Sequence, residues 1–297
     1  MLNSDIRAKA RDIRSTTDGM IFLFMPPILI SFLSSLVTSY LKFAYSWAGI
    51  PIFNKAVEEF GSLRSFQIHL SPPCIFFNLA IECLIITACF QLIRVVRKEG
   101  CRLTFMDCFN RLDEKNIFPL VLTVVIRRAL LFVSGLPILI GTSLISWYLV
   151  EKGVLFTIYM GLLPDLRDFF FSSNVQLGLV VLIIGGLVTS FIGYSFSLVE
   201  FLLYDHLEIG TYSSPFALFK QSWQLMKGNR WRLFLLDLSF LGWFFGIFMT
   251  LGLLAFHVYP YYWTCRVLFY EDLKAKNPLV FKSLFSESNR FISSSVV

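Results

Sequence analysis

Charged side chains are scarce in this sequence. Asp, Glu, Lys and Arg make up 15% of its 297 residues, against roughly 25% in an average soluble domain. Hydrophobic residues make up 56%, among them 33 Phe. A single globular core of this length cannot bury so much apolar surface, so the excess must face lipid. The composition therefore excludes a disordered chain, a disulfide-rich secreted domain and an ordinary cytosolic enzyme.

Cysteine and histidine are also rare, and their spacing indicates neither a disulfide framework nor a metal site. The six Cys residues form no CxxC pair, and the three His residues stand far apart from one another. A metal site needs several such ligands at short, regular spacing. We therefore expect no disulfide, no metal and no cofactor.

Short catalytic motifs are missing as well. The sequence contains no GxSxG, HExxH, GxxxxGK[ST] or GxGxxG motif, and no pair of aspartates in a GxGD context. These motifs place a nucleophile, a metal or a phosphate beside its partner groups. Because no nucleophile and base stand together in the sequence, we expect that the protein is not an enzyme.

Long apolar runs, by contrast, recur along the chain. Four of them, 20–41, 74–93, 129–150 and 175–203, have the length of about 20 residues that one membrane crossing needs. The fifth run, 231–270, is about twice that length, and Gly252 offers a turn that divides it into 231–250 and 253–270. The expected fold is all-α: a single integral membrane domain over 1–297, built as a polytopic transmembrane helical bundle of about six spans.

The distribution of basic residues predicts the orientation of these spans. With six spans and both termini in the cytoplasm, 21 of the 26 Lys and Arg residues fall in cytoplasmic segments and 5 in outer loops. Cytoplasmic loops of membrane proteins are enriched in Lys and Arg. We therefore expect a multi-pass protein of the cell membrane with both termini, including a tail over 271–297, in the cytoplasm.

Short amphipathic basic segments, 2–14, 104–116 and 215–227, precede three of the spans. In the clearest, Ser214 is a candidate N-cap, Pro215 takes the first helical position and Gly228 is placed to end the helix. Thr104 and Asp107 form a candidate capping box at the start of another. We expect interfacial helices on the cytoplasmic side. The apolar face of 215–227 is predicted to consist of Phe216, Phe219, Trp223 and Met226.

The net charge of +6 bears on the partners of the protein. Basic residues gathered at an inner membrane surface suit a lipid bilayer with anionic headgroups. No soluble basic domain exists to bind nucleic acid, so we expect no nucleic-acid partner. A protein partner or a homo-oligomer stays open at this point.

Ionisable residues inside the spans require an explanation, because each costs about 2.5–3.5 kcal/mol at mid-bilayer on insertion scales. Glu82 lies near the middle of its span, where it could bind a proton, a cation or a substrate, or be a neutral hydrogen-bonded carboxyl. Asp237 lies 14 residues before Leu251 and Arg266 15 residues after it, so the two are predicted to pair on adjacent antiparallel helices.

Glu200, together with Arg127 or Arg128, is expected at a depth similar to that of this pair. The hypothesis is therefore a polar cluster in the inner half of the membrane, formed by Glu200, Asp237, Arg266 and one of the two arginines. The alternative is that these residues are structural ion pairs that set the register of the helices.

One long segment also resembles a known family. The run from Ala217 to Phe240, followed by Gly242-Trp243, Tyr259-Pro260-Tyr261 and the segment Phe269 to Leu273, is similar to the multi-pass integral membrane proteins of the domain-of-unknown-function family 975, found mainly in Gram-positive bacteria. The segment from Ile6 to Ile13 resembles that family's opening basic helix. The family has no assigned activity, so the resemblance implies a membrane location and topology and no catalytic residues.

Two functions fit these observations. The first is a non-enzymatic accessory, scaffold or regulatory component of the bacterial cell envelope that acts through its inner-surface helices. The alternative is a transporter or channel-like protein with an intramembrane carboxylate site at Glu82 and the inner cluster. The two predict different sensitivities: only the transporter requires the carboxylate of Glu82.

Overall fold

The computed structural model describes residues 2–47, 72–97, 102–109, 114–152, 171–278 and 281. Within these ranges the chain is helical and contains no strand. It divides into two compact units. The first unit comprises Met1–Leu36, Phe76–Ile126 and Tyr194–Val297, and the second comprises Val37–Ile75 and Arg127–Gly193. The expected all-α fold is confirmed.

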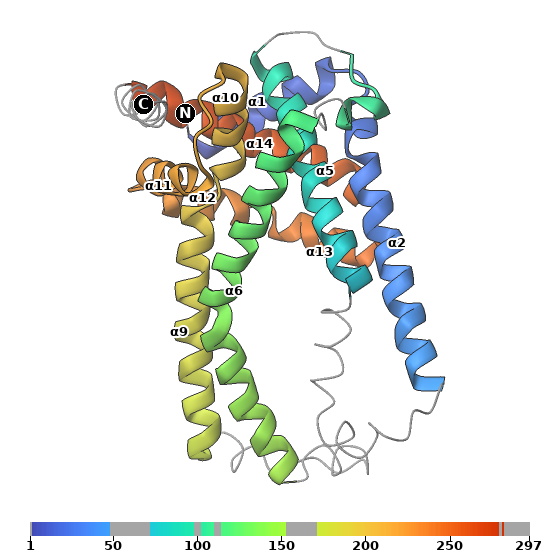
Figure 1. The fold of residues 1–297 in the computed structure, drawn as a ribbon, viewed down its shortest axis with the longest axis vertical. Helices are drawn as coiled ribbons and strands as arrows, with labels where there is room; N and C mark the ends of the chain where they lie inside the picture. The colour runs from blue at the N-terminus through green and yellow to red at the C-terminus, as the bar shows by residue number, and fades with distance from the viewer. Residues whose placement is uncertain are drawn as a thin grey trace. The chain divides into compact units, whose positions relative to one another are not determined.

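The helices follow one another in the order shown in Figure 1. They are α1 (Asn3–Thr16), α2 (Met20–Trp47), α5 (Pro72–Arg97), the 3-10 helix η1 (Phe105–Cys108), α6 (Glu114–Glu151), α9 (Ser173–Ser195), α10 (Val199–Ile209), α11 (Pro215–Leu225), α12 (Arg230–Leu238), α13 (Leu241–Met249) and α14 (Ala255–Lys276).

Five helical segments of the described chain are long and apolar enough to cross a membrane. They are Met20–Tyr40, Phe76–Arg97, Asn116–Glu151, Ser173–Ile209 and Arg230–Met249. Each contains one of the first five predicted spans or overlaps it closely. A multi-pass membrane protein is the architecture that this number of apolar helices indicates.

The predicted sixth span, 253–270, forms a helix but is not among these five segments. The turn before it lies where Gly252 predicts it, with φ values of +51° at Leu251 and +91° at Gly252. Apolar side chains of α14 are buried in the core of the first unit: Val258, Val267 and Phe269 are at most 1% exposed. A helix that is apolar on all sides can be covered by protein instead of lipid, and hydropathy does not separate the two cases.

Three other predicted spans have different bounds in the structure. The segment 175–203 divides into α9 and α10, because the chain turns between Ser195 and Val199. The segment 231–250 divides into α12 and α13 in the same way, at Ser239 and Phe240. The third span begins earlier than predicted, since α6 runs without a break from Glu114 to Glu151. Arg127 and Arg128 therefore lie within this helix and not at its start.

Of the predicted surface helix over 104–116, residues 110–113 lie outside the part of the chain that the structure describes. The capping box is present, because the Asp107 carboxylate accepts hydrogen bonds from the Thr104 amide at 2.7 Å and from its hydroxyl at 2.8 Å. The turn that it caps is the four-residue helix η1. The Cys108 thiol donates to the Leu84 carbonyl of α5 at 3.4 Å. The Cys108 side of this turn is therefore buried in the protein interior.

The N-terminal helix is also held by protein contacts. Ile6 and Ala10 of α1 are fully buried, in a helix that packs on α14 and α12. Asn3 Nδ2 donates to the Arg232 carbonyl at 3.0 Å. At the turn into α2, Gly19 has a φ of +87°, and a Cβ there would stand 1.9 Å from the Leu103 carbonyl oxygen. Only glycine fits this close approach.

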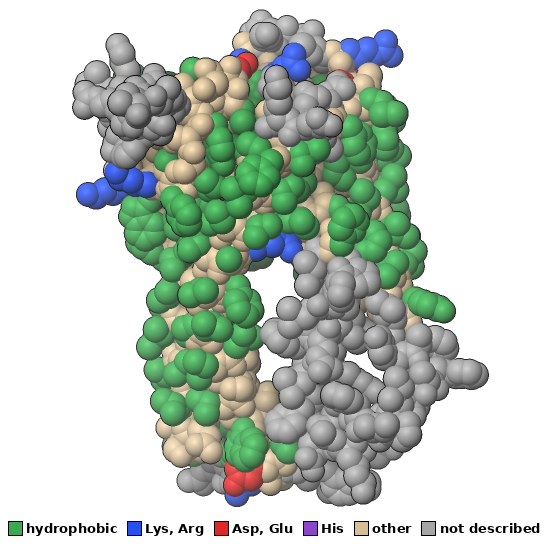
Figure 2. Space-filling model, viewed as in Figure 1, with side chains coloured by type: hydrophobic (Ala, Val, Ile, Leu, Met, Phe, Trp, Pro, Cys, Tyr) green, Lys and Arg blue, Asp and Glu red, His purple; other side chains and the backbone are tan. Residues whose placement is uncertain are grey.

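The second unit contains an antiparallel pair formed by α6 and α9 that is packed through glycine. A Cβ at Gly141 would lie 2.7 Å from the Gly178 carbonyl oxygen, and a Cβ at Gly185 would lie 2.9 Å from the Ile138 nitrogen. The Thr189 hydroxyl donates to the Ser134 carbonyl across the same contact at 2.8 Å. Hydrophobic side chains cover the outside of both helices on the face in Figure 2. Small residues at the contact and apolar ones outside are typical of helices in lipid.

We predict that Gly185→Ala destabilises the protein by about 1–3 kcal/mol, the usual cost of overpacking, because the new methyl group would meet backbone atoms of α6. The measurement is thermal unfolding of the purified protein in detergent. Gly186→Ala is the matched control, since nothing lies within 4 Å of a Cβ at that position. Equal melting temperatures for the two variants would show that α6 and α9 do not pack closely at Gly185.

Candidate functional site

The predicted pair of Asp237 and Arg266 is present in the first unit. Arg266 Nη2 lies 2.7 Å from Asp237 Oδ2, and Arg266 Nε donates to Oδ1 at 3.4 Å. The side chains of Asp237 and Arg266 are 16% and 12% exposed, respectively. The guanidinium also lies over the rings of Tyr262 at 5.2 Å and Trp263 at 5.7 Å. The prediction from equal distances to the turn is therefore confirmed.

The other members of the predicted cluster stay a prediction. Glu200 is buried, at 4% exposure, in the first turn of α10. Arg127 and Arg128 belong to the second unit and Glu200 to the first, so their approach stays a prediction. Glu82 is half-buried on α5, and its predicted role in binding a proton or a cation likewise stays a prediction.

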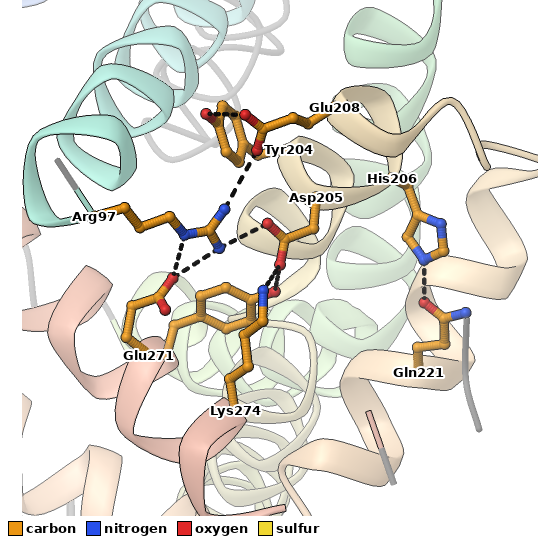
Figure 3. A network of polar contacts seen from close by, with 9 residues as sticks. Arg97, Tyr204, Asp205, His206, Glu208, Gln221, Glu271 and Lys274 are labelled. Carbon is orange, nitrogen blue, oxygen red and sulfur yellow. Dashed lines mark hydrogen bonds and ion pairs between the residues drawn. The ribbon is translucent and has the colours of Figure 1, made fainter. Parts of the chain in front are cut away.

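A larger polar network in the first unit was not predicted from the sequence. It joins α5, α10 and α14 around the carboxylate of Asp205, which is 2% exposed (Figure 3). Arg97 Nη2 lies 2.7 Å from Asp205 Oδ1, and Lys274 Nζ lies 2.9 Å from Oδ2. The Tyr270 hydroxyl donates to Oδ2 at 2.6 Å. Three partners thus surround one buried carboxylate.

Arg97 is the centre from which this network extends to the surface. Its guanidinium also lies 2.8 Å from Glu271 and 3.3 Å from Glu208, and Figure 3 shows it directed into the space between the three acids. Glu208 is 45% exposed, against 2% for Asp205. Removing one partner of a buried ion pair is costly, whereas exposed pairs contribute little. Asp205 is therefore the member on which we expect stability to depend.

The sequence offered a weak signal for this network. Arg97, Asp205 and Glu271 each stand at or just beyond the cytoplasmic end of a predicted span, where basic residues are usually explained by topology alone. That topological rule enriches Lys and Arg on the cytoplasmic side but does not enrich Asp or Glu there. An acid such as Asp205 at a predicted inner end could thus have been considered as a partner for Arg97.

A second buried carboxylate, Asp272, joins the end of α14 to α12. Arg232 Nη2 lies 2.6 Å from Asp272 Oδ2, and Lys276 Nζ lies 3.1 Å from the same oxygen. Burial opposes ionisation of this carboxyl, but hydrogen bonds that include those from Arg232 and Lys276 outweigh it and lower its pKa to about 2. Asp272 is therefore ionised throughout the physiological pH range.

Polar contacts also fix α11 against α10. His206 Nε2 lies 2.7 Å from Gln221 Oε1, and its Nδ1 lies 2.9 Å from the Thr211 hydroxyl. The Ser222 hydroxyl donates to the Ser195 carbonyl at 2.8 Å. The predicted N-cap is present, because the Ser214 hydroxyl accepts a hydrogen bond from the Ala217 amide at 3.4 Å. These contacts determine which side of α11 is buried.

The predicted apolar face of α11 is therefore wrong in its orientation. Phe219 and Met226 are buried, at 5% and 0% exposure, whereas Phe216 and Trp223 are 68% and 39% exposed. The prediction failed because the buried side includes polar residues, Gln221 and Ser222, whose hydrogen bonds are made inside the protein. A pattern of apolar residues cannot identify a buried polar side chain as part of the core.

The exposed side of α11 carries both aromatic and basic residues. Phe216, Lys220 and Trp223 are exposed and are spaced at i, i+4 and i+7, which places them on one stripe of α11. Lys227 is also exposed and lies in the turn that follows the helix. The Arg230 guanidinium lies 4.8 Å from the centre of the Trp223 ring, in the range of a cation–π contact. We call these five residues the aromatic–basic surface.

The described cysteines and histidines show no arrangement of reactive groups. Cys83, Cys89, Cys108 and Cys265 are buried and form no disulfide. Burial raises the pKa of the Cys108 thiol to about 11, against a smaller lowering by the hydrogen bond with Thr87, so this thiol is protonated at neutral pH. Within the ranges that the structure describes, no three His, Cys, Asp and Glu side chains gather where they could hold a metal ion.

For the pair of Asp237 and Arg266, we predict non-additive destabilisation. Asp237→Asn and Arg266→Gln should each cost about 3 kcal/mol, because either change leaves a buried group without its charged partner. The double variant should lose less than the sum of the two, by at least about 1 kcal/mol. Unfolding in detergent measures the three variants, and strictly additive losses would contradict a direct interaction.

For the Arg97 network, we predict that burial decides the cost of losing a carboxylate. Asp205→Asn should destabilise the protein by about 3 kcal/mol, because Arg97 and Lys274 would both lose the negative charge of their buried partner. Glu208→Gln, which removes an exposed contact with the same Arg97, should change stability by about 0.5 kcal/mol or less. If the two variants lost equal stability in thermal unfolding, the burial of Asp205 would not decide the cost, and the contribution of the network would depend on Arg97 alone.

Comparison with known proteins agrees with the resemblance seen in the sequence. The model of the family described as Protein of unknown function (DUF975) matches residues 1–277. No curated protein and no solved structure matches the chain. The match covers both the α1 segment and the α11 to α14 segment that carry the sequence resemblance. The chain therefore belongs to the family of proteins of unknown function DUF975.

Proposed function

We propose that the protein is a non-enzymatic accessory or scaffold component of the cell membrane that acts through the aromatic–basic surface of α11. The observation that carries this proposal is the exposed stripe of Phe216, Lys220 and Trp223 on a helix whose opposite side is held by buried contacts, with Lys227 exposed in the turn after it. A rigidly placed exposed surface of this kind suits recognition. No acidic residue occurs between Ile209 and Leu236, so this segment contributes only basic charges to the surface.

The chemistry of this surface fits the interface of a bilayer with anionic headgroups. Trp and other aromatic residues are enriched at that interface, and each Lys near an anionic leaflet contributes about 1 kcal/mol. We propose that α11 lies at the inner leaflet, where it presents the protein to a partner protein or to a second copy of itself. A nucleic acid is not expected as a partner.

We further propose that both termini lie on the cytoplasmic side. Asn3 at the start of α1 donates to the Arg232 carbonyl, and the Arg232 side chain binds Asp272 near the end of α14. The two ends of the described chain are therefore neighbours. Ends on one side require an even number of crossings, which supports six spans with α14 surrounded by other helices.

Support for an accessory protein also comes from the polar groups inside the first unit. The carboxylates of Asp205, Asp237 and Asp272 each form a close ion pair with Arg97, Arg266 and Arg232, respectively. Paired charges of this kind are typical of ion pairs that fix helix positions. The protonated Cys108 thiol likewise gives no support to nucleophilic catalysis.

The alternative function, a transporter or channel-like protein, is favoured by one observation. Glu82 lies on the candidate span with the largest buried share, 61% of its apolar window. An ionisable residue within such a helix is a candidate for a proton or cation site. The two functions differ in kind, since only the transporter needs the carboxylate of Glu82.

The test is purification from native membranes in mild detergent, with mass spectrometry of the proteins that elute at comparable amounts. We predict that a partner elutes with the wild type and falls by at least about tenfold, or about 1.4 kcal/mol, for Phe216→Ser combined with Lys220→Glu. The matched control is Phe76→Ser combined with Lys152→Glu. Phe76 has the same exposure as Phe216, 68%, and Lys152 is exposed.

The opposite result would be a wild-type protein that elutes alone and carries out ion or solute flux in liposomes. Loss of that flux in Glu82→Gln, with unchanged thermal unfolding, would establish the transporter function instead. A partner that elutes equally with the Phe216 and Phe76 variants would show that another surface holds it.

A further inference from the structure

An apolar groove lies in the first unit, on the side of α2 that faces the turn between α13 and α14. Its volume is about 640 Å³, within the range of small-molecule sites. The walls are formed by three parts of the chain: Ile28 and Phe32 on α2, Phe248 and Leu251 at the end of α13 and the turn, and Phe256 and Tyr259 on α14.

The lining of this groove contains no charged residue and no histidine. The hydroxyl of Ser35 is occupied within its own helix, since it donates to the Ser31 carbonyl at 3.1 Å. The neighbouring Thr250 hydroxyl donates to the Gly246 carbonyl and accepts from the Leu254 amide at 3.1 Å. Water or a polar solute in the groove would thus find few partners.

The rim of the groove displays large apolar side chains. Leu251 is 90% exposed and Phe248 and Leu253 are each 74% exposed. The backbone holds Leu251 in this position at a φ of +51°. Residues other than glycine rarely adopt this backbone conformation. Such exposure is costly in water and costs nothing in hydrocarbon. Both Phe32 and Phe248 belong to candidate membrane spans, so the mouth of the groove opens toward lipid.

We propose that this groove binds one acyl chain of a membrane phospholipid. The dimensions favour a chain over a protein helix: along α2 the wall runs from Ile28 to Ser35, a rise of about 10 Å, whereas a helix that packs in a membrane needs a longer face. The Ser31 hydroxyl and the Tyr259 phenol are the remaining polar side-chain groups of the lining. This site is separate from the aromatic–basic surface and does not depend on the proposed function.

The experiment uses the full-length protein in vesicles of phosphatidylethanolamine and phosphatidylglycerol. A phosphatidylglycerol with a photoactivatable diazirine in its acyl chain is the probe, and mass spectrometry maps the labelled peptides. We expect labelling of 28–35 and 247–259 to saturate at low probe fraction, and to exceed that of the exposed apolar residues of α9 by about tenfold, or about 1.4 kcal/mol.

Filling the groove should remove this labelling. Ser35→Trp places a large side chain in the groove from an exposed position, and Ser31→Trp is a second variant of the same kind. Ser143→Trp is the matched control, since Ser143 is also exposed on a candidate span and its hydroxyl also bonds within its own helix, to the Ile140 carbonyl at 2.8 Å. Unchanged thermal unfolding shows that each variant is folded.

Three results would overturn the proposal. The first is groove labelling that rises in proportion to the probe and equals that of α9, which indicates ordinary lipid contact. The second is labelling that persists in both Ser35→Trp and Ser31→Trp. The third is cross-linking of the groove to a second copy of the chain or to another protein, which would identify a protein as its occupant.

Discussion

The packing of the first unit depends on the neutralisation of one buried negative charge, that of the Asp205 carboxylate. Asp205 would be unstable in an apolar interior unless positive charge lay beside it, since the cost of removing an ion from water is large. Arg97 and Lys274 supply that charge from two other helices, and the Tyr270 hydroxyl supplies a hydrogen bond. Because the three partners come from α5 and α14, the carboxylate on α10 fixes the positions of all three helices at once.

The two units solve the problem of helix packing in different ways. In hydrocarbon, apolar side chains gain nothing by leaving lipid for the protein interior, so helices need close packing or polar contacts to associate. The second unit uses close packing, with Gly141 and Gly178 where α6 and α9 approach each other. The first unit uses polar contacts, with the ion pairs of Asp205, Asp237 and Asp272. The family DUF975, to which the chain belongs, has no assigned activity.

The position of α11 links the interior of the first unit to the proposed function. His206 and Ser222 anchor the helix on α10 and the preceding turn, and as a result Phe216 and Lys220 face outward. If the helix were free to rotate at a membrane surface, Phe219 and Met226 would turn toward lipid, as the sequence pattern predicts. The buried hydrogen bonds prevent this, so internal polar contacts decide which residues the protein presents to its surroundings.

The sequence by itself determined the elements that depend on local chemistry and on composition. The helical fold, most of the apolar segments, the Ser214 cap, the Thr104 capping box and the turn at Gly252 follow from neighbouring residues, because caps and turns need particular side chains and a glycine conformation. The pairing of Asp237 with Arg266 followed as well, because the tight turn between α13 and α14 converts equal sequence distances into equal depth.

Only the tertiary structure decided the features that depend on contacts between distant segments. In this network Asp205 lies 108 positions after Arg97 and 69 positions before Lys274, and no local pattern relates the three residues. The same holds for α14, whose apolar residues enter a protein core, and for the buried side of α11. Hydropathy measures only how strongly a side chain avoids water. Whether protein or lipid replaces that water is set by which helices lie beside it, and this is a property of the folded chain.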